Sequence, residues 1–315
     1  MSLLHFTRKF AKLHTASKNG EKAPHKSILL LSIIQSIEYG EVYENKIYIT
    51  PKLAARFKDN WHTYVSSQLF HPKFYLPFYH LVTEGFWFLK MLPGRELALT
   101  SSYSPKSFTA LAQVIDYAYL DEELFMLLMN EASRISLQQT LINTYFHGLQ
   151  IAPQYDLFGK IEAQILNESP APYLRKITEI DEEEKFIRDG VFKTTIPRIY
   201  NYTCCISGLR IISTRNVQMV DACHIIPFSE TRDQDADNIK NGLSLSPNLH
   251  RALDRFLITI DQDFRVVVSD QFTESGDHVI KQFHGKRIHL PTEMKYIPSL
   301  ENLNWHYLKY HDIHL

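Results

Sequence analysis

The chain has 315 residues, of which 44% are hydrophobic and 22% charged. At roughly 100 to 200 residues per domain, this length predicts two domains, each able to bury a core of its own. The composition excludes fibrous and disordered classes. The longest apolar run, 28–34, is far shorter than the roughly 18 residues of a membrane span. Basic residues interrupt the start of the chain, where a signal peptide has its apolar segment, so we expect no membrane segment and no export.

The cysteines indicate a reducing compartment. Only Cys204, Cys205 and Cys223 are present, an odd number clustered in one region. Disulfide-stabilised secreted domains carry even numbers of cysteines at spread positions. We therefore expect a cytoplasmic protein without a disulfide framework.

The net charge of −1 is an average over two halves of opposite sign. Residues 1–110 hold 14 lysines and arginines against 7 aspartates and glutamates, a charge of +7. The remaining residues hold 20 against 28, a charge of −8. A basic first half is compatible with a nucleic-acid partner, which the net charge alone argues against.

The first 110 residues predict a mostly helical domain with a small sheet. Pro24, placed before the apolar run 28–34, predicts a buried helix that ends at Gly40. Because 70–88 is dense in proline, glycine and aromatic residues, it predicts short strands and turns. The hydrophobic periodicity predicts further helices over 3–13 and 52–65 and a strand within 42–50.

The middle of the chain predicts more helices and a boundary. Residues 107–150 indicate two or three helices and 158–166 another, while the acidic run 181–184 favours the start of a further helix. Prolines and polar residues make 167–172 the best linker candidate. The sequence therefore predicts an α+β protein with a domain at 1–150, a helical linker region at 151–185 and a second domain at 186–315.

The second domain opens its most informative stretch with a strand. Residues 217–226 are apolar enough to be buried. Side chains alternate along a strand, so Asp221 and Cys223 are expected on one face and His224 on the other. Asn241-Gly242 predicts a turn that leads into a second strand.

A helix follows this second strand. Ser246 is a good N-cap, and Pro247 is favoured at the first helical position. His250 then lies in the first turn, with Asp254 one turn later on the same face. A strand, a turn and a helix thus converge on two histidines and an asparagine.

The order His224, Asn241, His250 resembles the HNH nuclease family with its ββα-metal finger, over about residues 186–265. The resemblance also rests on flanking words, which read Cys204-Cys205-Ile206-Ser207-Gly208, His224-Ile225, Asn241-Gly242-Leu243-Ser244-Leu245 and Leu249-His250-Arg251-Ala252-Leu253-Asp254. It implies that His224 is the general base, that Asn241 holds the loop orienting the imidazole, and that His250 binds a metal ion. A histidine near its ordinary pKa suits a base at neutral pH.

The resemblance implies one Mg²⁺ or Mn²⁺ ion per site. Many relatives have an aspartate or histidine ligand directly before the base, but here Cys223 stands there, and Asp221 is the nearest carboxylate. We expect Asp221 to be the second ligand beside His250, because Mg²⁺ prefers oxygen to sulfur. Whether Asp221 or Cys223 fills that position stays open. Paired zinc-binding cysteines are missing, so no structural zinc is expected.

Two arginines on the same helix are candidates for DNA contacts. Arg251 and Arg255 are spaced to reach one phosphate backbone beside His250. The alternative is a solvated helix face. Cys204 and Cys205 are expected to be small core residues.

The first half resembles the sulfur-binding domain of modification-dependent restriction enzymes, over about residues 1–110. The matching words are Ala23-Pro24-His25-Lys26 with the apolar run after it, and Leu76-Pro77-Phe78-Tyr79-His80-Leu81. Such domains read phosphorothioate DNA, so the resemblance implies a modified duplex as partner. Here Leu76 and Lys26 replace the tyrosine and arginine of many relatives, which leaves another modification, or none, open.

A sulfur atom on phosphate is larger, softer and less hydrated than the oxygen it replaces. A reader therefore needs an apolar cup beside cations. Tyr75, Pro77 and Tyr79 are the candidates for the cup, and His25 and Lys26 for the cations. The alternative is that the aromatic residues of 70–88 form the core of a small domain.

Taken together, these features predict a cytoplasmic, prokaryotic, metal-dependent HNH endonuclease that restricts foreign double-stranded DNA carrying a modification such as phosphorothioate. Whether it acts as a homodimer stays open. Two alternatives remain. One is a DNA-binding module with an inactive nuclease scaffold, and the other is an HNH nuclease whose first domain binds a protein or a small signal.

Overall fold

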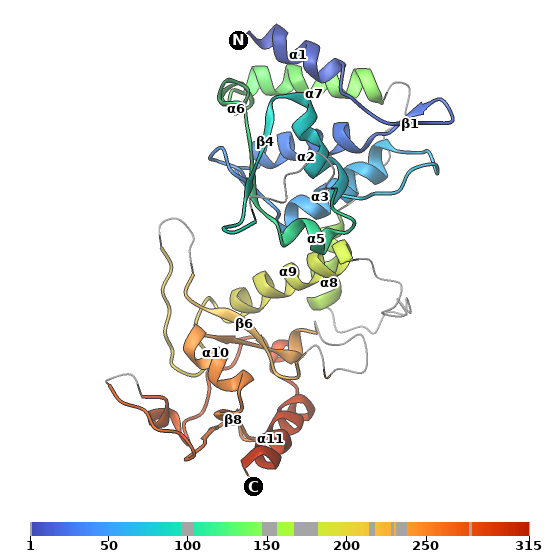
Figure 1. Cartoon of the computed structure of the whole chain (residues 1–315). Helices are drawn as coiled ribbons and strands as arrows, with labels where there is room; N and C mark the ends of the chain where they lie inside the picture. Colours follow the sequence, from blue (N-terminus) through green and yellow to red (C-terminus); the bar gives the residue numbers. More distant parts are fainter. Residues whose placement is uncertain are drawn as a thin grey trace. The chain divides into compact units, whose positions relative to one another are not determined.

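The structure is a computed structural model that describes residues 2–95, 104–146, 156–166, 182–213, 218–227, 230, 238–276 and 279–314. Its class is mixed α+β, as the sequence predicts. The chain divides into two compact units (Figure 1). Unit 1 comprises Met1–Phe158 and Asp181–Ile187, and unit 2 comprises Gly159–Ile180 and Arg188–Leu315. The linker candidate 167–172 lies outside the described residues.

Unit 1 is built around a buried helix, α2 (His25–Glu38). Every residue from Lys26 to Ile34 is buried, and Gly40, with φ +69, directly follows the helix end. The helix expected over 24–40 is therefore confirmed. It packs against α3 (Pro51–Tyr64), α4 (Tyr75–His80), α6 (Glu122–Met129) and α7 (Glu131–Tyr145), while α1 (Leu3–Ala11) lies on α7.

Two small antiparallel sheets complete unit 1. A hairpin of β1 (Ser17–Lys18) and β2 (Glu21–Lys22) closes through Asn19 and Gly20, both with positive φ. The larger sheet has the order β3 (Ile47–Tyr48), β5 (Ile115–Leu120), β4 (Trp87–Met91). The expected strand within 42–50 is thus limited to two residues.

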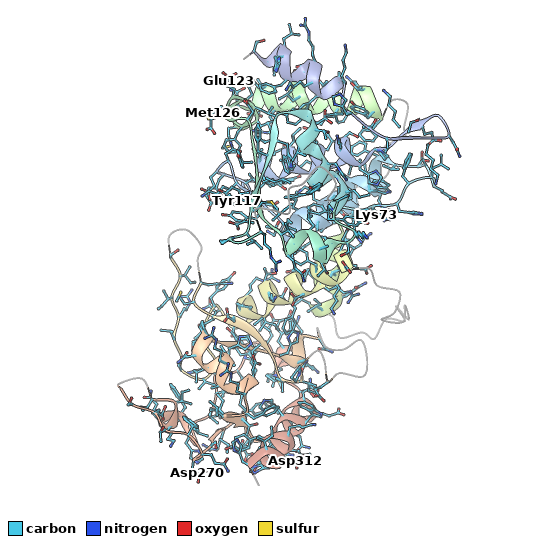
Figure 2. The ribbon with its side chains drawn as sticks, viewed as in Figure 1. Lys73, Tyr117, Glu123, Met126, Asp270 and Asp312 are labelled. Carbon is cyan, nitrogen blue, oxygen red and sulfur yellow. The ribbon has the colours of Figure 1, made fainter. Side chains whose placement is uncertain are left out.

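The two or three helices expected over 107–150 are confirmed as α5 (Phe108–Ala112), α6 and α7, but the sequence prediction missed β5, which follows α5. Ala118 and Leu120 point into the core, whereas Tyr119 is 37% exposed on the outer face. Tyr117, half-buried, is labelled in Figure 2. Because tyrosines on one face alternate with apolar residues on the other, the strand lacks the apolar–polar alternation by which a strand is recognised.

The prediction of short strands and turns over 70–88 is also largely wrong. The segment forms α4 and the 3-10 helix η1 (Leu81–Glu84), and β4 begins only at Trp87. Pro77 lies in the first turn of α4, where a missing N–H breaks no helical hydrogen bond. Phe74, Phe78 and Trp87 are fully buried, so these aromatic side chains form part of the core.

Unit 2 joins helices to two hairpins. The predicted helices at 158–166 and after the acidic run are confirmed as α8 (Leu157–Leu166) and α9 (Glu182–Ile199), of which unit 2 includes α9 from Arg188 onward. The remaining elements are β6 (Asp221–His224), β7 (Gly242–Leu245), α10 (Pro247–Asp254), β8 (Ile258–Ile260), β9 (Val266–Val268) and α11 (Leu300–His314), with 3-10 turns η4 (Ile239–Asn241), η5 (Ile280–Phe283) and η6 (Met294–Tyr296).

Helix α11 holds the end of α10 through histidines. His306 Nε2 donates to the carbonyl of Leu253 at 3.2 Å, which leaves Nδ1 to accept from Thr259 Oγ1 at 2.8 Å. His314 Nε2 donates to the carbonyl of Phe256 at 2.7 Å. Burial lowers the pKa of His306 to about 4, so its ring is neutral at pH 7. Within the described ranges, no helix is both long and apolar enough to cross a membrane.

Candidate active site and metal centre

The site is a two-stranded ribbon followed by a helix. β6 and β7 pair antiparallel, with Asp221 opposite Leu245 and His224 opposite Gly242. Ser246 and Pro247 then begin α10 at the positions expected from the sequence. The Ser246 hydroxyl does not cap the helix backbone but donates to Asn248 Oδ1 at 2.7 Å.

The two faces of β6 carry different side chains, as alternation predicts. Asp221 and Cys223 lie against α10. Asp221 Oδ2 is 3.5 Å from His250 Nδ1, and Cys223 Sγ is 3.8 Å from Asp254 Oδ1. His224 instead stacks on Phe192 of α9, with ring centroids 4.0 Å apart and planes 5° from parallel. The Phe192 ring packs against one face of the imidazole and so restricts its rotation. The ring nitrogens lie at the edge of the imidazole, which the stacked ring does not cover.

Asn241 fixes the chain just after His224. Its side chain is 1% exposed. Its Oδ1 accepts from the backbone N–H of Ile226 at 2.9 Å, and its Nδ2 donates to the carbonyl of the same residue at 3.0 Å. Asn302 of α11 donates to Asn241 Oδ1 at 3.3 Å. The amide therefore satisfies both backbone groups of Ile226, two residues beyond the histidine.

Gly242 lets α9 approach the ribbon closely. A Cβ at this position would overlap the Ile196 side chain and stand 3.1 Å from Phe192 Cζ. The ribbon thus touches the same helix that carries the ring stacked on His224. Asn241 is needed for its side-chain hydrogen bonds to Ile226, and Gly242 is needed because no Cβ fits beside Ile196. The Asn-Gly pair does not close a tight hairpin, because residues 225–241 separate the two strands.

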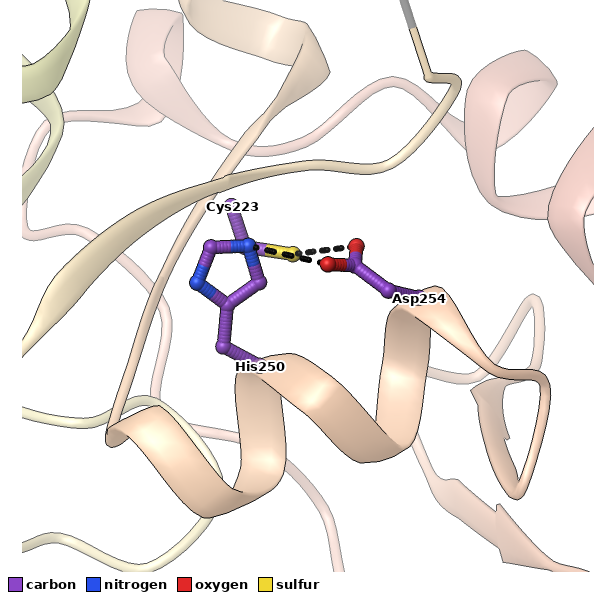
Figure 3. Close-up of side chains that lie close together, drawn as sticks. All are labelled: Cys223, His250 and Asp254. Carbon is purple, nitrogen blue, oxygen red and sulfur yellow. Dashed lines mark hydrogen bonds and ion pairs between the residues drawn. The ribbon is translucent and has the colours of Figure 1, made fainter. Parts of the chain in front are cut away.

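On the other face, three side chains surround His250. Its Nδ1 lies 3.5 Å from Asp221 Oδ2 and its Nε2 lies 3.4 Å from Asp254 Oδ2. Cys223 Sγ lies 3.8 Å from Asp254 Oδ1 (Figure 3). Ligand atoms of Cys223, His250 and Asp254 all lie within 4.8 Å of one another, a spacing that suits a single metal ion.

The electrostatics differ between the members of this cluster. Cys223 is fully buried, whereas the side chains of Asp221 and Asp254 are 52% and 51% exposed. Burial, followed by the neighbouring Asp254, raises the pKa of the Cys223 thiol well above its ordinary value. The protein alone therefore holds Cys223 as a thiol, and a bound cation is needed to favour the thiolate.

The two arginines predicted to contact DNA lie on the outside of α10. Arg251 and Arg255 are exposed. Arg251 stands on the helix that carries His250, and Arg255 is the C-cap of the same helix.

The predicted DNA-reading residues of unit 1 do not form one open cup. Pro77 and Tyr79 are buried, and Tyr75 is half-buried. Lys26 is 8% exposed, and its Nζ donates to Thr83 Oγ1 at 2.8 Å and to the carboxylate of Glu84. The Lys26 charge is thus already paired inside the protein.

His25 lies in an aromatic niche. Its ring meets Trp61 and Phe70 edge-on, with centroids 4.8 Å and 6.0 Å away. Its Nε2 lies 2.9 Å from the carbonyl of His71. Burial lowers the pKa of His25, although the bond to His71 acts the other way. Of the five predicted residues, His25 and Tyr75 retain partial exposure.

Two residues of the site have no role in the sequence prediction. Asp254 had a usable signal, because it follows His250 by four residues and so shares its helix face. Phe192 had none, since nothing in the periodicity of α9 indicates which of its side chains meets His224.

The comparisons with known proteins agree with the geometry of this segment. Residues 204–261 match the family model of HNH endonucleases. No curated protein sequence matches the chain.

Two solved structures resemble parts of the chain. One is a modification-dependent TagI restriction endonuclease, with 18% identity, a TM-score of 0.28, and coverage of 38% of this chain and 36% of that chain. The other is the sulfur-binding domain of ScoMcrA complexed with phosphorothioated DNA, with 23% identity, a TM-score of 0.36, and coverage of 46% and 89%. The match thus spans about a third of the restriction endonuclease. The prediction of a nuclease domain is confirmed by the family match, and residues 204–261 of this chain are an HNH endonuclease domain.

Proposed function

We propose that this protein is a divalent-metal-dependent endonuclease that hydrolyses phosphodiester bonds in double-stranded DNA. The observation that carries the proposal is the division of β6 into two faces. One face holds His224 against Phe192, and the other holds the cluster around His250. Each side of a scissile phosphate then meets a different kind of group, a base for the attacking water and a cation site for the leaving oxygen.

His224 acts as the general base and takes a proton from the attacking water. Phe192 holds the ring plane, and Asn241 holds the backbone that follows it. A positioned histidine of this kind contributes about 10²- to 10⁴-fold to a rate. His250 would help to hold a divalent ion, which would supply positive charge next to the scissile phosphate and the leaving oxygen.

We propose that residues 1–150 form a domain that reads DNA, that residues 151–185 link the two domains, and that residues 186–315 form the domain that cuts DNA. The support for a reader is the +7 charge of residues 1–110 and their resemblance to sulfur-binding domains. His25, in its aromatic niche, and Tyr75 are the candidates that keep partial exposure, and each offers a poorly hydrated ring. Such an environment favours a phosphate in which sulfur replaces one oxygen. We therefore propose that the protein restricts modified DNA in the cytoplasm.

The test uses the full chain and three matched plasmids that are unmodified, phosphorothioated or methylated at cytosine. We expect nicked or linear product only with added Mn²⁺, Mg²⁺ or another divalent ion, and fastest on phosphorothioated DNA. Equal rates on all three plasmids would remove the modification specificity and keep the nuclease. No cleavage with any divalent ion would favour a DNA-binding module on an inactive scaffold.

A further inference from the structure

We propose that the metal ion of this domain is held by Cys223, His250 and Asp254, and that Asp221 is not a ligand but orients His250. The site then takes an ion with affinity for sulfur, of the Zn²⁺ or Co²⁺ kind, in preference to Mg²⁺. The inference rests on the proposed function for what the ion does, and on geometry alone for where the ion binds.

Two donor distances, one to each carboxylate oxygen of Asp254, are close to those around one tetrahedral ion, and ligand atoms of all three residues lie within 4.8 Å of one another. With bonds of about 2.0 Å to nitrogen or oxygen and about 2.3 Å to sulfur, tetrahedral ligands stand about 3.3 Å apart for an N–O pair and about 3.5 Å for an S–O pair. His250 Nε2 and Asp254 Oδ2 are 3.4 Å apart, and Cys223 Sγ and Asp254 Oδ1 are 3.8 Å apart. Figure 3 shows the three side chains converging from β6 and α10.

Asp221 meets the other ring nitrogen. Its Oδ2 is 3.5 Å from His250 Nδ1, whereas Asp254 faces Nε2. The two nitrogens of an imidazole point in different directions, so an ion on Nε2 leaves Nδ1 as the donor. A carboxylate that accepts from the free nitrogen of a metal-bound histidine fixes its tautomer and raises its basicity. Asp221 has the position for that role.

Three protein donors leave one tetrahedral position open, which is the arrangement of catalytic rather than structural sites. The closed side of the cluster is that of Cys223, which is fully buried. The open side is that of Asp254, whose side chain is 51% exposed, and His250, at 26%. A phosphate oxygen can therefore approach from solvent.

The donor set decides the metal. Mg²⁺ requires near-octahedral oxygen ligands and keeps its waters. Thiolate and imidazole instead select zinc-like ions. Asp254 is the single carboxylate in the group of three, so the cluster is a poor magnesium site.

The first experiment titrates the metal-free full chain with Co²⁺ and records absorption, which needs no DNA. We expect a thiolate-to-cobalt charge-transfer band in the near ultraviolet. Cys223→Ser removes this band. Cys205→Ser, which removes a thiol that is equally buried but outside the cluster, leaves it intact. Asp221→Asn keeps the band and weakens Co²⁺ affinity about 10- to 100-fold, as for other partners of metal-bound histidines.

The proposal is overturned if Co²⁺ binds without the band, if Cys223→Ser retains it, or if Asp221→Asn abolishes binding altogether. X-ray absorption of the metal-loaded wild type decides the matter without any variant, in case Cys223→Ser does not fold. One sulfur at about 2.3 Å from the metal supports the site, and a shell of nitrogen and oxygen alone contradicts it. Cobalt binding without DNA cleavage contradicts the proposed function only, whereas cleavage with a sulfur-free shell contradicts this site only.

Discussion

Two histidines within the same small motif lie in different surroundings, which support the different roles that we propose for them. His224 has an aromatic ring on one side and a backbone fixed by Asn241 after it. His250 has a carboxylate opposite each ring nitrogen. The first environment suits a group that must accept a proton from water, and the second suits a ligand whose tautomer is fixed. In both cases the neighbours decide what the imidazole does.

Replacing Asn241 tests this division at the residue scale. Asn241→Ala leaves the half-buried N–H and carbonyl of Ile226 without their side-chain partner, so we expect a loss of about 1 kcal/mol in the free energy of unfolding. Cleavage should slow as well, because the segment after His224 loses its anchor. Denaturant unfolding and cleavage rates measure the two effects.

Asn302→Ala is the matched control, since it removes only the 3.3 Å bond to Asn241 and keeps both bonds to Ile226. Its effect on stability and on cleavage should be smaller. Equal stability and equal cleavage of Asn241→Ala and the wild type would contradict the anchoring role.

At the scale of elements, the helices were more predictable than the strands. The helix around 28–34 is apolar on all sides, begins after Pro24 and ends before Gly40, so three local signals agree. β5 carries tyrosines on its outer face, so its sequence does not alternate between apolar and polar residues as a strand with one solvated face does. The ribbon of β6 and β7 was predictable from Asp221 to Leu245, but its contact with α9 depends on tertiary packing that no local pattern records.

Helix α11 makes unit 2 sensitive to acid through His306. The pKa of this residue is lowered to about 4 in the folded state from an ordinary value of 6.5. The folded protein therefore binds fewer protons than the unfolded chain between these values. The contribution of His306 to stability is complete above pH 6.5 and is lost as the pH falls through 4, with a limit of about 3 kcal/mol.

We expect the free energy of unfolding of the wild type to fall from pH 7 to pH 4, and His306→Gln to show a shallower fall, because glutamine does not titrate. Denaturant unfolding at a series of pH values provides the measurement. The absolute stability of His306→Gln at pH 7 will be lower, since the bonds to Thr259 and Leu253 change. Parallel pH profiles for the two proteins would show that His306 is not the titrating group.

At the scale of the whole molecule, charge is divided along the chain. The first 110 residues carry a charge of +7, which suits contact with phosphates, and the remainder carries −8. The proposed division into a DNA-reading and a DNA-cutting domain rests on this charge and on the ordered motifs of the sequence. The exposure of the candidate DNA-binding residues could not be predicted from the sequence. Lys26, for example, forms an ion pair with Glu84 inside the core, and no local pattern indicates this pairing.

The arginines of α10 should contribute to binding without specifying a sequence. Changing Arg251 and Arg255 together to Gln is expected to weaken DNA affinity similarly on all sequences and to lower the slope of log affinity against log salt by about 2. The control changes Lys193 and Lys295 to Gln, which removes the same charge from residues already paired with acids. A slope unchanged in the arginine variant would mean that neither residue meets phosphate.

The central claim is that the HNH domain cuts DNA with His224 as its base. The most direct test compares His224→Ala with the wild type in metal-dependent cleavage and in DNA affinity, with His289→Ala, an exposed histidine of unit 2, as control. The account predicts that cleavage by His224→Ala falls by about 10²-fold or more while its DNA affinity stays at the wild-type value. Cleavage by His224→Ala at the wild-type rate would contradict it.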